Sequence, residues 1–90
     1  MLGLEKAMNQ LARTPKQIGA ILRRQRGLAK LSQTELAERA GLRQELVSKI
    51  ESGKPGTRIE TICDLFAALE LDLLVAPRSK SSARDIEDIF

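Results

Sequence analysis

Residues 32–53, SQTELAERAGLRQELVSKIESG, constrain the fold most strongly, because they carry two short helical patterns separated by a tight turn. Ser32 is a good helix N-cap, and Glu35, three residues later, completes a capping box before an apolar run. Gly41 follows the last apolar residue of the first pattern, where a left-handed backbone closes a helix without a Cβ clash. The first helix should therefore end near residue 40.

The second pattern covers residues 44–51 and ends before Gly53. Val47 and Ile50 are three apart and face inward, while the polar residues lie on the other sides of the helix. Two helices of about eight residues joined by a short turn with a glycine match the helix-turn-helix unit. The sequence therefore predicts a mainly α fold, a compact helical bundle built around this unit.

The polar face of the second helix carries side chains that can read base pairs in a DNA groove. Gln44 can bind adenine through two hydrogen bonds, Arg43 suits guanine, and Glu45 can accept from cytosine. The alternative is a solvated face of an ordinary amphipathic helix. The complete two-helix pattern favours DNA contact.

These spaced residues resemble the phage-repressor-like, or XRE, helix-turn-helix family. The resemblance implies a bundle of about five helices that binds operator DNA as a dimer. It rests on the following positions: Gln33, Glu35, Leu36, Ala37, Gly41, Gln44, Val47, Ser48, Ile50, Glu51 and Gly53.

The same resemblance implies which residues contact DNA. Gln33 would brace Gln44 against a phosphate. The base-reading residues would be Arg43, Gln44, Glu45, Ser48 and Lys49. We expect phosphate contacts from the start of the first helix and from the loop after the second, namely Ser32, Gln33, Lys54, Thr57 and Arg58.

Charge is unevenly divided along this 90-residue chain, which is long enough for one domain. Residues 13–58 hold eleven Lys and Arg against four Glu, a net of +7, whereas residues 59–76 hold four acidic residues and no basic one, a net of −4. This asymmetry suits nucleic acid on one face. The basic part contains the base-reading helix.

Several functions are excluded or disfavoured by the residues that are present. The chain has no His, which excludes imidazole ligands and Ser-His-Asp triads, and its one cysteine, Cys63, is expected in the core rather than as a reactive thiol. No stretch reaches membrane-spanning length and no signal pattern opens the chain, so we expect a cytoplasmic protein. We expect no metal, no cofactor and no enzymatic activity.

Three further helical patterns flank the unit. Residues 1–12 can form an amphipathic helix, and residues 13–76 would form the XRE-type domain. Thr14 caps a scaffold helix on which Arg23, Arg24 and Arg26 should lie exposed, either solvated or on phosphates. After the loop at residues 54–58, the last helix should close the core with the apolar residues Ile59, Ile62, Cys63, Phe66 and Leu69.

Residues 71–76, LDLLVA, are short, apolar and followed by Pro77, which is typical of a β-strand. A lone strand leaves its backbone groups unpaired, so we expect pairing with the same strand of a second subunit across a two-fold axis. The alternative is an extension of the last helix. A homodimer with recognition helices about 34 Å apart would read a palindrome. The predicted dimer residues are Leu71, Leu73, Leu74 and Val75.

The helices followed by a strand and a loose tail also resemble HipB-type antitoxins, through the segments TPKQIGAILRRQR and LELDLLV. This resemblance implies a repressor of its own operon that holds a HipA-like serine/threonine kinase toxin inactive. Residues 77–90 would be a flexible tail, frayed or folding on the toxin through Ile86, Ile89 and Phe90. The alternatives are a stand-alone regulator without a toxin, and a domain that uses the fold only for protein contacts.

Overall fold

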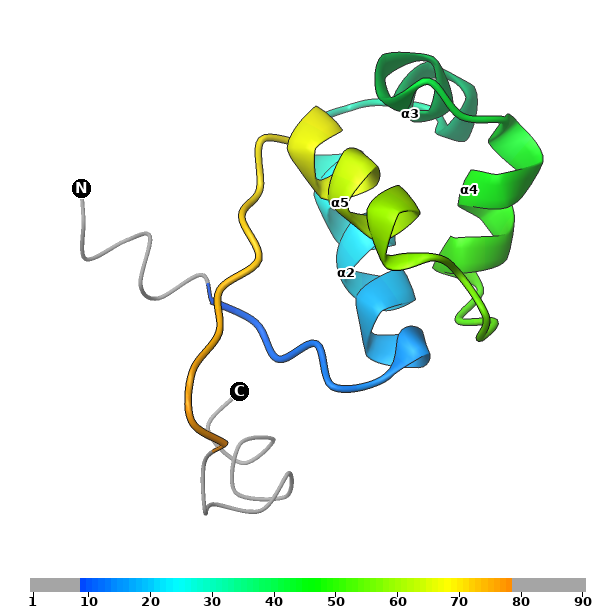
Figure 1. Cartoon of the computed structure of the whole chain (residues 1–90). Coiled ribbons are helices and arrows are strands. Elements are labelled where there is room, and N and C mark those ends of the chain that lie inside the picture. The colour runs from blue at the N-terminus through cyan, green and yellow to red at the C-terminus, as the bar shows by residue number, and fades with distance from the viewer. Residues whose placement is uncertain (1–8, 79–90) are drawn as a thin grey trace.

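Four helices pack around one apolar core in the computed structural model, which describes residues 9–78 (Figure 1). α4 packs against both α2 and α3, and α3 also packs against α5. The mainly α prediction is confirmed. The helices are α2 (Pro15–Leu28), α3 (Gln33–Ala40), α4 (Gln44–Glu51) and α5 (Ile59–Ala68).

Each of the four helices contributes one side chain that is fully buried in the core. These residues are Leu22, Leu36, Val47 and Leu65, all 0% exposed. Burial of one such side chain stabilises a fold by about 1.5–3 kcal/mol. The core therefore ties all four helices together and fixes where α4 lies.

The predicted starts of two helices are confirmed by their capping boxes. The Thr14 hydroxyl accepts a hydrogen bond from the Gln17 N–H at 3.1 Å, and the Thr14 N–H donates to Gln17 Oε1 at 3.1 Å. Ser32 and Glu35 form the same reciprocal pair at 3.0 and 2.8 Å. Gly41, with a φ of 71°, ends α3 in the left-handed region as the sequence predicted.

The predicted inward face of α5 is partly wrong. Ile59 is 70% exposed and Cys63 is exposed, whereas Leu65, which the predicted stripe omitted, is fully buried. The buried residues Ile62, Leu65 and Phe66 are spaced three and four apart and define one helical face, and Cys63 lies beside that face. Ile59 lies near the same face but is the first residue of α5. Cys63 is therefore not a core residue.

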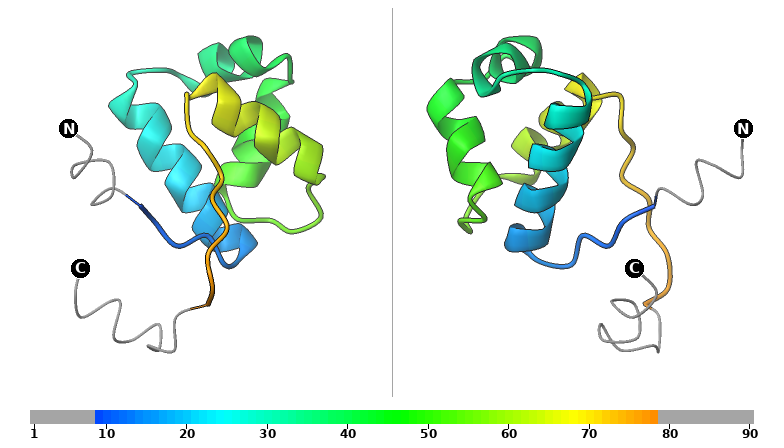
Figure 2. Two further views of the ribbon diagram at one scale, coloured as in Figure 1. Left: turned by 60° about the vertical axis from the view of Figure 1, so that its left-hand side comes forward. Right: turned by 180° about the vertical axis from the view of Figure 1, so that it is seen from behind.

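The chain after α5 does not continue as a helix, so the helix-extension alternative is wrong. α5 ends at Ala68, Glu70 has a positive φ of 58°, and the Leu71 N–H donates to the Phe66 carbonyl oxygen at 2.8 Å. Residues 71–78 then leave the bundle along one side (Figures 1 and 2). Their side chains are exposed, except that Leu71 packs against the core.

The predicted β-strand at residues 71–76 is not confirmed, since no strand is present among residues 9–78. Strand pairing needs a neighbouring strand. At the other end, residues 9–12 are not helical, and the rest of the helix expected at residues 1–12 lies outside the described residues. Most of the tail expected at residues 77–90 also lies outside them, including Ile86, Ile89 and Phe90.

Gly19 is the point of closest approach between α2 and α4. A Cβ atom at this position would lie 2.3 Å from the Ile50 carbonyl oxygen and 2.9 Å from that of Glu51. Both neighbours are backbone atoms of α4 and cannot rotate away. Only glycine therefore allows α4 to pack this closely against α2.

We expect Gly19→Ala to lower the free energy of unfolding by about 1–3 kcal/mol, because the added methyl group pushes α4 away from α2. The matched control is Gly27→Ala in the same helix, where a Cβ meets nothing within 4 Å. That variant should be stabilised by up to about 1 kcal/mol through helix propensity. Urea unfolding measures both, and equal effects at the two glycines would contradict the packing argument.

Candidate nucleic-acid interface

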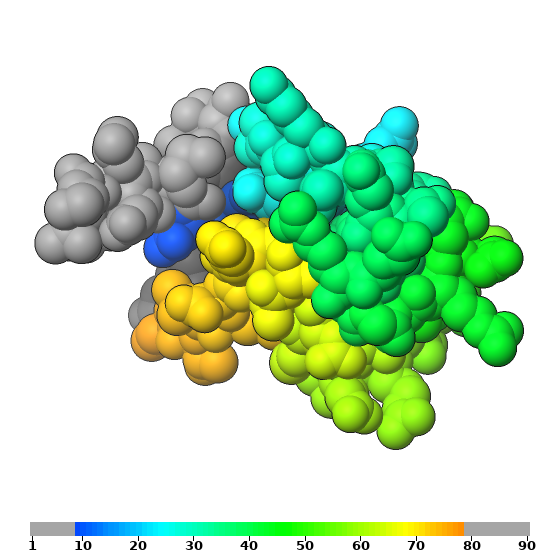
Figure 3. Space-filling model, turned by 90° about the horizontal axis from the view of Figure 1, so that it is seen from above, coloured from blue at the N-terminus to red at the C-terminus, as the bar shows by residue number. Residues whose placement is uncertain are grey.

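α3 and α4 form a helix-turn-helix unit with a turn of three residues, 41–43. The Leu42 N–H donates to the Ala37 carbonyl oxygen at 2.8 Å, which closes the end of α3. Ala37 itself is buried. The space-filling view from above shows α3 and α4, in teal and green, at one end of the molecule and residues 69–78, in yellow and orange, toward the other (Figure 3).

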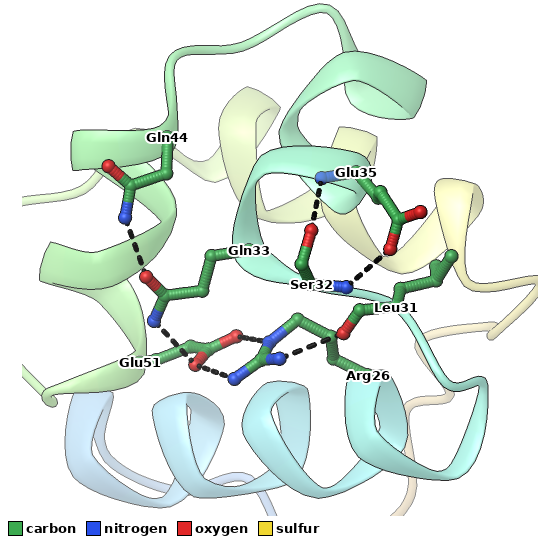
Figure 4. Close-up of polar contacts among 7 residues, drawn as sticks. All are labelled: Arg26, Leu31, Ser32, Gln33, Glu35, Gln44 and Glu51. Atoms are coloured by element: carbon green, nitrogen blue, oxygen red, sulfur yellow. Dashed lines mark hydrogen bonds and ion pairs between the residues drawn. The ribbon is translucent and has the colours of Figure 1, made fainter.

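A chain of side-chain hydrogen bonds links three helices beneath the start of α4 (Figure 4). Gln44 Nε2 donates to Gln33 Oε1 at 2.6 Å, and Gln33 Nε2 donates to Glu51 Oε1 at 3.0 Å. Arg26 Nε donates to Glu51 Oε2 at 2.6 Å and Arg26 Nη2 donates to Glu51 Oε1 at 3.0 Å. We call Arg26, Glu51, Gln33 and Gln44 the polar relay.

The relay contains a largely buried ion pair. The Glu51 side chain is 3% exposed and that of Arg26 is 18% exposed. The hydrogen bond from Arg26 to Glu51 raises the pKa of Arg26 above its ordinary value, partial burial lowers this pKa, and the charge of Glu51 raises it further. The guanidinium is therefore charged at neutral pH, and its Nη1 also donates to the Leu31 carbonyl oxygen at 2.9 Å.

The relay fixes the orientation of the Gln44 amide. An ionised Glu51 only accepts hydrogen bonds, so Gln33 donates through its Nε2 and turns its Oε1 toward Gln44. Gln44 must then donate through Nε2, which leaves its Oε1 and one N–H for another partner. An acceptor beside a donor is the pair that a glutamine uses to bind the edge of adenine in the major groove.

The other residues predicted to read bases lie on the outer side of α4 and the turn before it. Arg43, Glu45, Ser48 and Lys49 are all exposed, while Gln44 is half-buried by its contact with Gln33. A shallow surface hollow in this region is lined by Arg43, Glu45, Lys49 and their apolar neighbours. The structure brings the five predicted base-reading residues together on one side.

The residues predicted to bind phosphate are less uniform. Ser32 and Gln33 lie at the start of α3, and Lys54 and Arg58 are exposed in the loop between α4 and α5. Thr57 differs, because its hydroxyl oxygen is buried without a hydrogen-bond partner among the described residues. As placed, that hydroxyl does not face solvent where a phosphate could reach it.

Two relay residues have roles that the sequence did not predict. Arg26 was expected on the exposed side of its helix, which is wrong, and Glu51 was part of the family pattern without an assigned contact. The sequence holds a partial signal for Glu51 and none for Arg26. A carboxylate in the last turn of a helix is unfavourable beside the negative end of the helix dipole, which favours a cation near Glu51 but does not indicate which one.

Residues 9–78 lack two other kinds of feature. This part of the chain holds no group of three or more His, Cys, Asp and Glu residues placed to bind a metal ion. In the same part, no helix is long and apolar enough to cross a membrane.

α3, α4 and the turn between them, packed on α2 and α5, define a helix-turn-helix domain. A family model described as "Helix-turn-helix" (HTH_3) matches residues 22–75. The chain therefore belongs to this XRE-type family of DNA-binding transcriptional regulators, which are typically not enzymes.

Individual proteins agree with this family assignment. The chain is 38% identical over 68 residues to "Uncharacterized HTH-type transcriptional regulator y4dL" of Sinorhizobium fredii. The matched residues make up 74% of this chain and 35% of that protein. The chain thus spans about a third of that relative's length. Two solved structures share the fold with a TM-score of 0.73 and 24% identity, each matched over its full length and 79% of this chain. They are described as "MDT Protein" and "Structure of HipA-HipB-O2-O3 complex".

We expect Glu51→Gln to lower the free energy of unfolding by about 3 kcal/mol, because it leaves the largely buried Arg26 guanidinium without its counter-ion. Glu60→Gln is the matched control, since the Arg58–Glu60 pair at 3.6 Å is largely exposed on both sides. The control should lose less than about 1 kcal/mol. Chemical denaturation of both variants tests this, and similar losses would mean that the relay does not stabilise the fold.

Proposed function

We propose that this domain binds a palindromic operator as a homodimer and represses transcription, as the antitoxin of a HipA-like serine/threonine kinase toxin. The observation that carries the DNA-reading part is the polar relay, which orients Gln44 at the exposed start of α4. Such a regulator would work in the cytoplasm, where its operator lies.

In this proposal α4 enters the major groove and its outer residues set the sequence preference. Gln44 binds an adenine through its free Oε1 and N–H, with Arg43, Ser48 and Lys49 reading neighbouring base pairs. Glu45 accepts a hydrogen bond from the amino group of a cytosine. On either side of α4, the DNA phosphate backbone is bound by Ser32 and Gln33 at the start of α3 and by Lys54 and Arg58 in the loop after α4.

Gln44→Ala should weaken operator binding by about 1–3 kcal/mol and binding to random DNA much less, because it removes a base contact and leaves the phosphate contacts in place. Fluorescence anisotropy with both DNAs at one salt concentration measures the difference. Lys54→Ala is the control for a phosphate contact and should weaken both DNAs alike. If Gln44→Ala lowers the affinity for operator and for random DNA equally, Gln44 does not read bases.

The dimer proposal rests on the exposed apolar residues after α5. Leu73, Leu74 and Val75 are 43%, 75% and 101% exposed, and their segment has left the helical bundle. A second copy of residues 71–76 could pair with these backbone groups and cover the side chains. Pairing of this kind would form a two-stranded ribbon.

Leu74→Glu should shift the chain from dimer toward monomer in analytical ultracentrifugation, because it puts a charge into the paired segment. The matched control is Ile59→Glu, since Ile59 on α5 is exposed to a similar degree, 70% against 75%. The control should stay dimeric. If only Ile59→Glu dissociates the dimer, the interface lies on α5 rather than on residues 71–76.

The antitoxin role is supported by the likeness of this fold to a chain of the HipA-HipB complex, and by the tail pattern of Ile86, Ile89 and Phe90. A stand-alone regulator is the second candidate, favoured by the likeness to a transcriptional regulator whose description includes no toxin. The two differ in whether a kinase-like protein binds the chain.

Affinity purification of the tagged chain from its native cells, with nuclease, should retain a kinase-like protein. Deletion of residues 85–90 should reduce this retention because it removes the proposed apolar contacts, while promoter DNA still co-purifies without nuclease. Promoter DNA with no protein partner would support the stand-alone regulator. Unchanged kinase retention after the deletion would show that the tail is not the toxin contact.

A further inference from the structure

One face of α2 carries three cations around a surface hollow. Lys16, Arg23 and Arg24 line it together with Ala20 and Gly27. The opposite wall is the end of α4, namely Glu51 and Ser52. We call this hollow, bounded by α2 and the end of α4, the α2 groove.

The spacing on α2 explains the shape of the groove. Positions 16, 20, 23, 24 and 27 recur at intervals of three and four and so share one helical face. Ala20 and Gly27 are the two smallest side chains of this face, and a Cβ at Gly27 would meet nothing within 4 Å. Long basic side chains therefore surround an open floor.

The charge of the groove is not balanced locally. Among residues 9–78, the ion pairs are Arg26–Glu51 and Arg58–Glu60. The Glu51 carboxylate on the groove wall is thus already held by Arg26. Lys16, Arg23 and Arg24 have no carboxylate partner in that part of the chain, so the groove presents net positive charge to solvent.

The groove also adjoins the DNA-reading side. Glu51 lines it and at the same time accepts the hydrogen bond from Gln33, which holds Gln44. In the view from behind, α2 lies alongside α4 (Figure 2, right). Cations in the α2 groove therefore flank the helix that would enter the major groove.

We propose that the α2 groove, with Lys16, Arg23 and Arg24 around the small residues Ala20 and Gly27, binds the phosphate backbone of DNA beside the bases read by α4. This inference rests on the proposed DNA-binding function and extends it, because the contacts come from the scaffold helix rather than from the helix-turn-helix unit. Such contacts add affinity and salt dependence without reading sequence.

Gly27 offers a charge series at one open position. Gly27→Gln is the reference for the added side-chain bulk, and against it Gly27→Glu should bind operator and random DNA several-fold more weakly and Gly27→Lys more tightly. Gln and Glu match in size, so their difference reports charge alone. Thermal unfolding checks that all three variants fold, which the open space at Gly27 favours.

The salt dependence gives a second readout. Each phosphate contact contributes about 0.9 to the slope of log K against log salt concentration, so the double variant Arg23→Gln/Arg24→Gln should flatten this slope by about two units. Gln44→Ala is the control and should leave the slope unchanged. If Gly27→Glu binds like Gly27→Gln and the double variant keeps the full slope, the α2 groove does not contact DNA.

These outcomes separate this inference from the proposed function. If the natural chain binds neither its own promoter nor random DNA, the proposed function and the role of the α2 groove are both wrong. Normal operator binding with no effect of the groove variants overturns only the α2 groove. If the groove variants bind the operator more weakly but random DNA as tightly as before, the α2 groove proposal is also wrong, since a phosphate contact contributes to the affinity for both DNAs.

Discussion

The carboxylate of Glu51 is the constraint on which the arrangement of α2, α3 and α4 depends. It lies at the end of α4, almost fully buried, and a buried charge is costly unless it is paired and hydrogen-bonded. Arg26 from α2 supplies the opposite charge, and Gln33 from α3 supplies a further hydrogen bond. Satisfying one carboxylate thus ties α4 to α2 and α3, and orients Gln44 through Gln33.

α2 and α5 contribute to the fold in different ways. α2 comes so close to α4 at Gly19 that only a hydrogen atom fits between them, and its cations beyond that contact lie beside the reading helix. α5 closes the opposite side of the core through Leu65 and its neighbours. Residues 71–78 then leave the bundle with exposed apolar side chains, and all but the last two belong to residues 59–76, which hold four acidic residues and no basic one.

Local patterns predicted the helices and their ends well, because capping and the left-handed glycine act within one turn of the chain. Ser32 with Glu35, Thr14 with Gln17, and Gly41 all lie where the sequence indicated. The face of α5 was predicted less well. Ile62 and Phe66 of the predicted stripe are buried, but the buried face extends from them toward Leu65 on one side and not toward Cys63 on the other. Only packing against the other helices selects between these two sides.

The sequence by itself determined the helix-turn-helix unit, its family, and which residues of α4 face outward, namely Glu45, Ser48 and Lys49, since the helical repeat fixes which positions lie opposite the buried Val47 and Ile50. Tertiary structure alone decided that Arg26 turns inward to Glu51 while Arg23 and Arg24 on the same helix stay outside. All three are arginines within four positions, and their sequence context gives each the same reason to be solvated. Their exposure differs because only Arg26 reaches a buried carboxylate 25 residues away, and the residues around Arg26 in the sequence do not indicate so distant a contact.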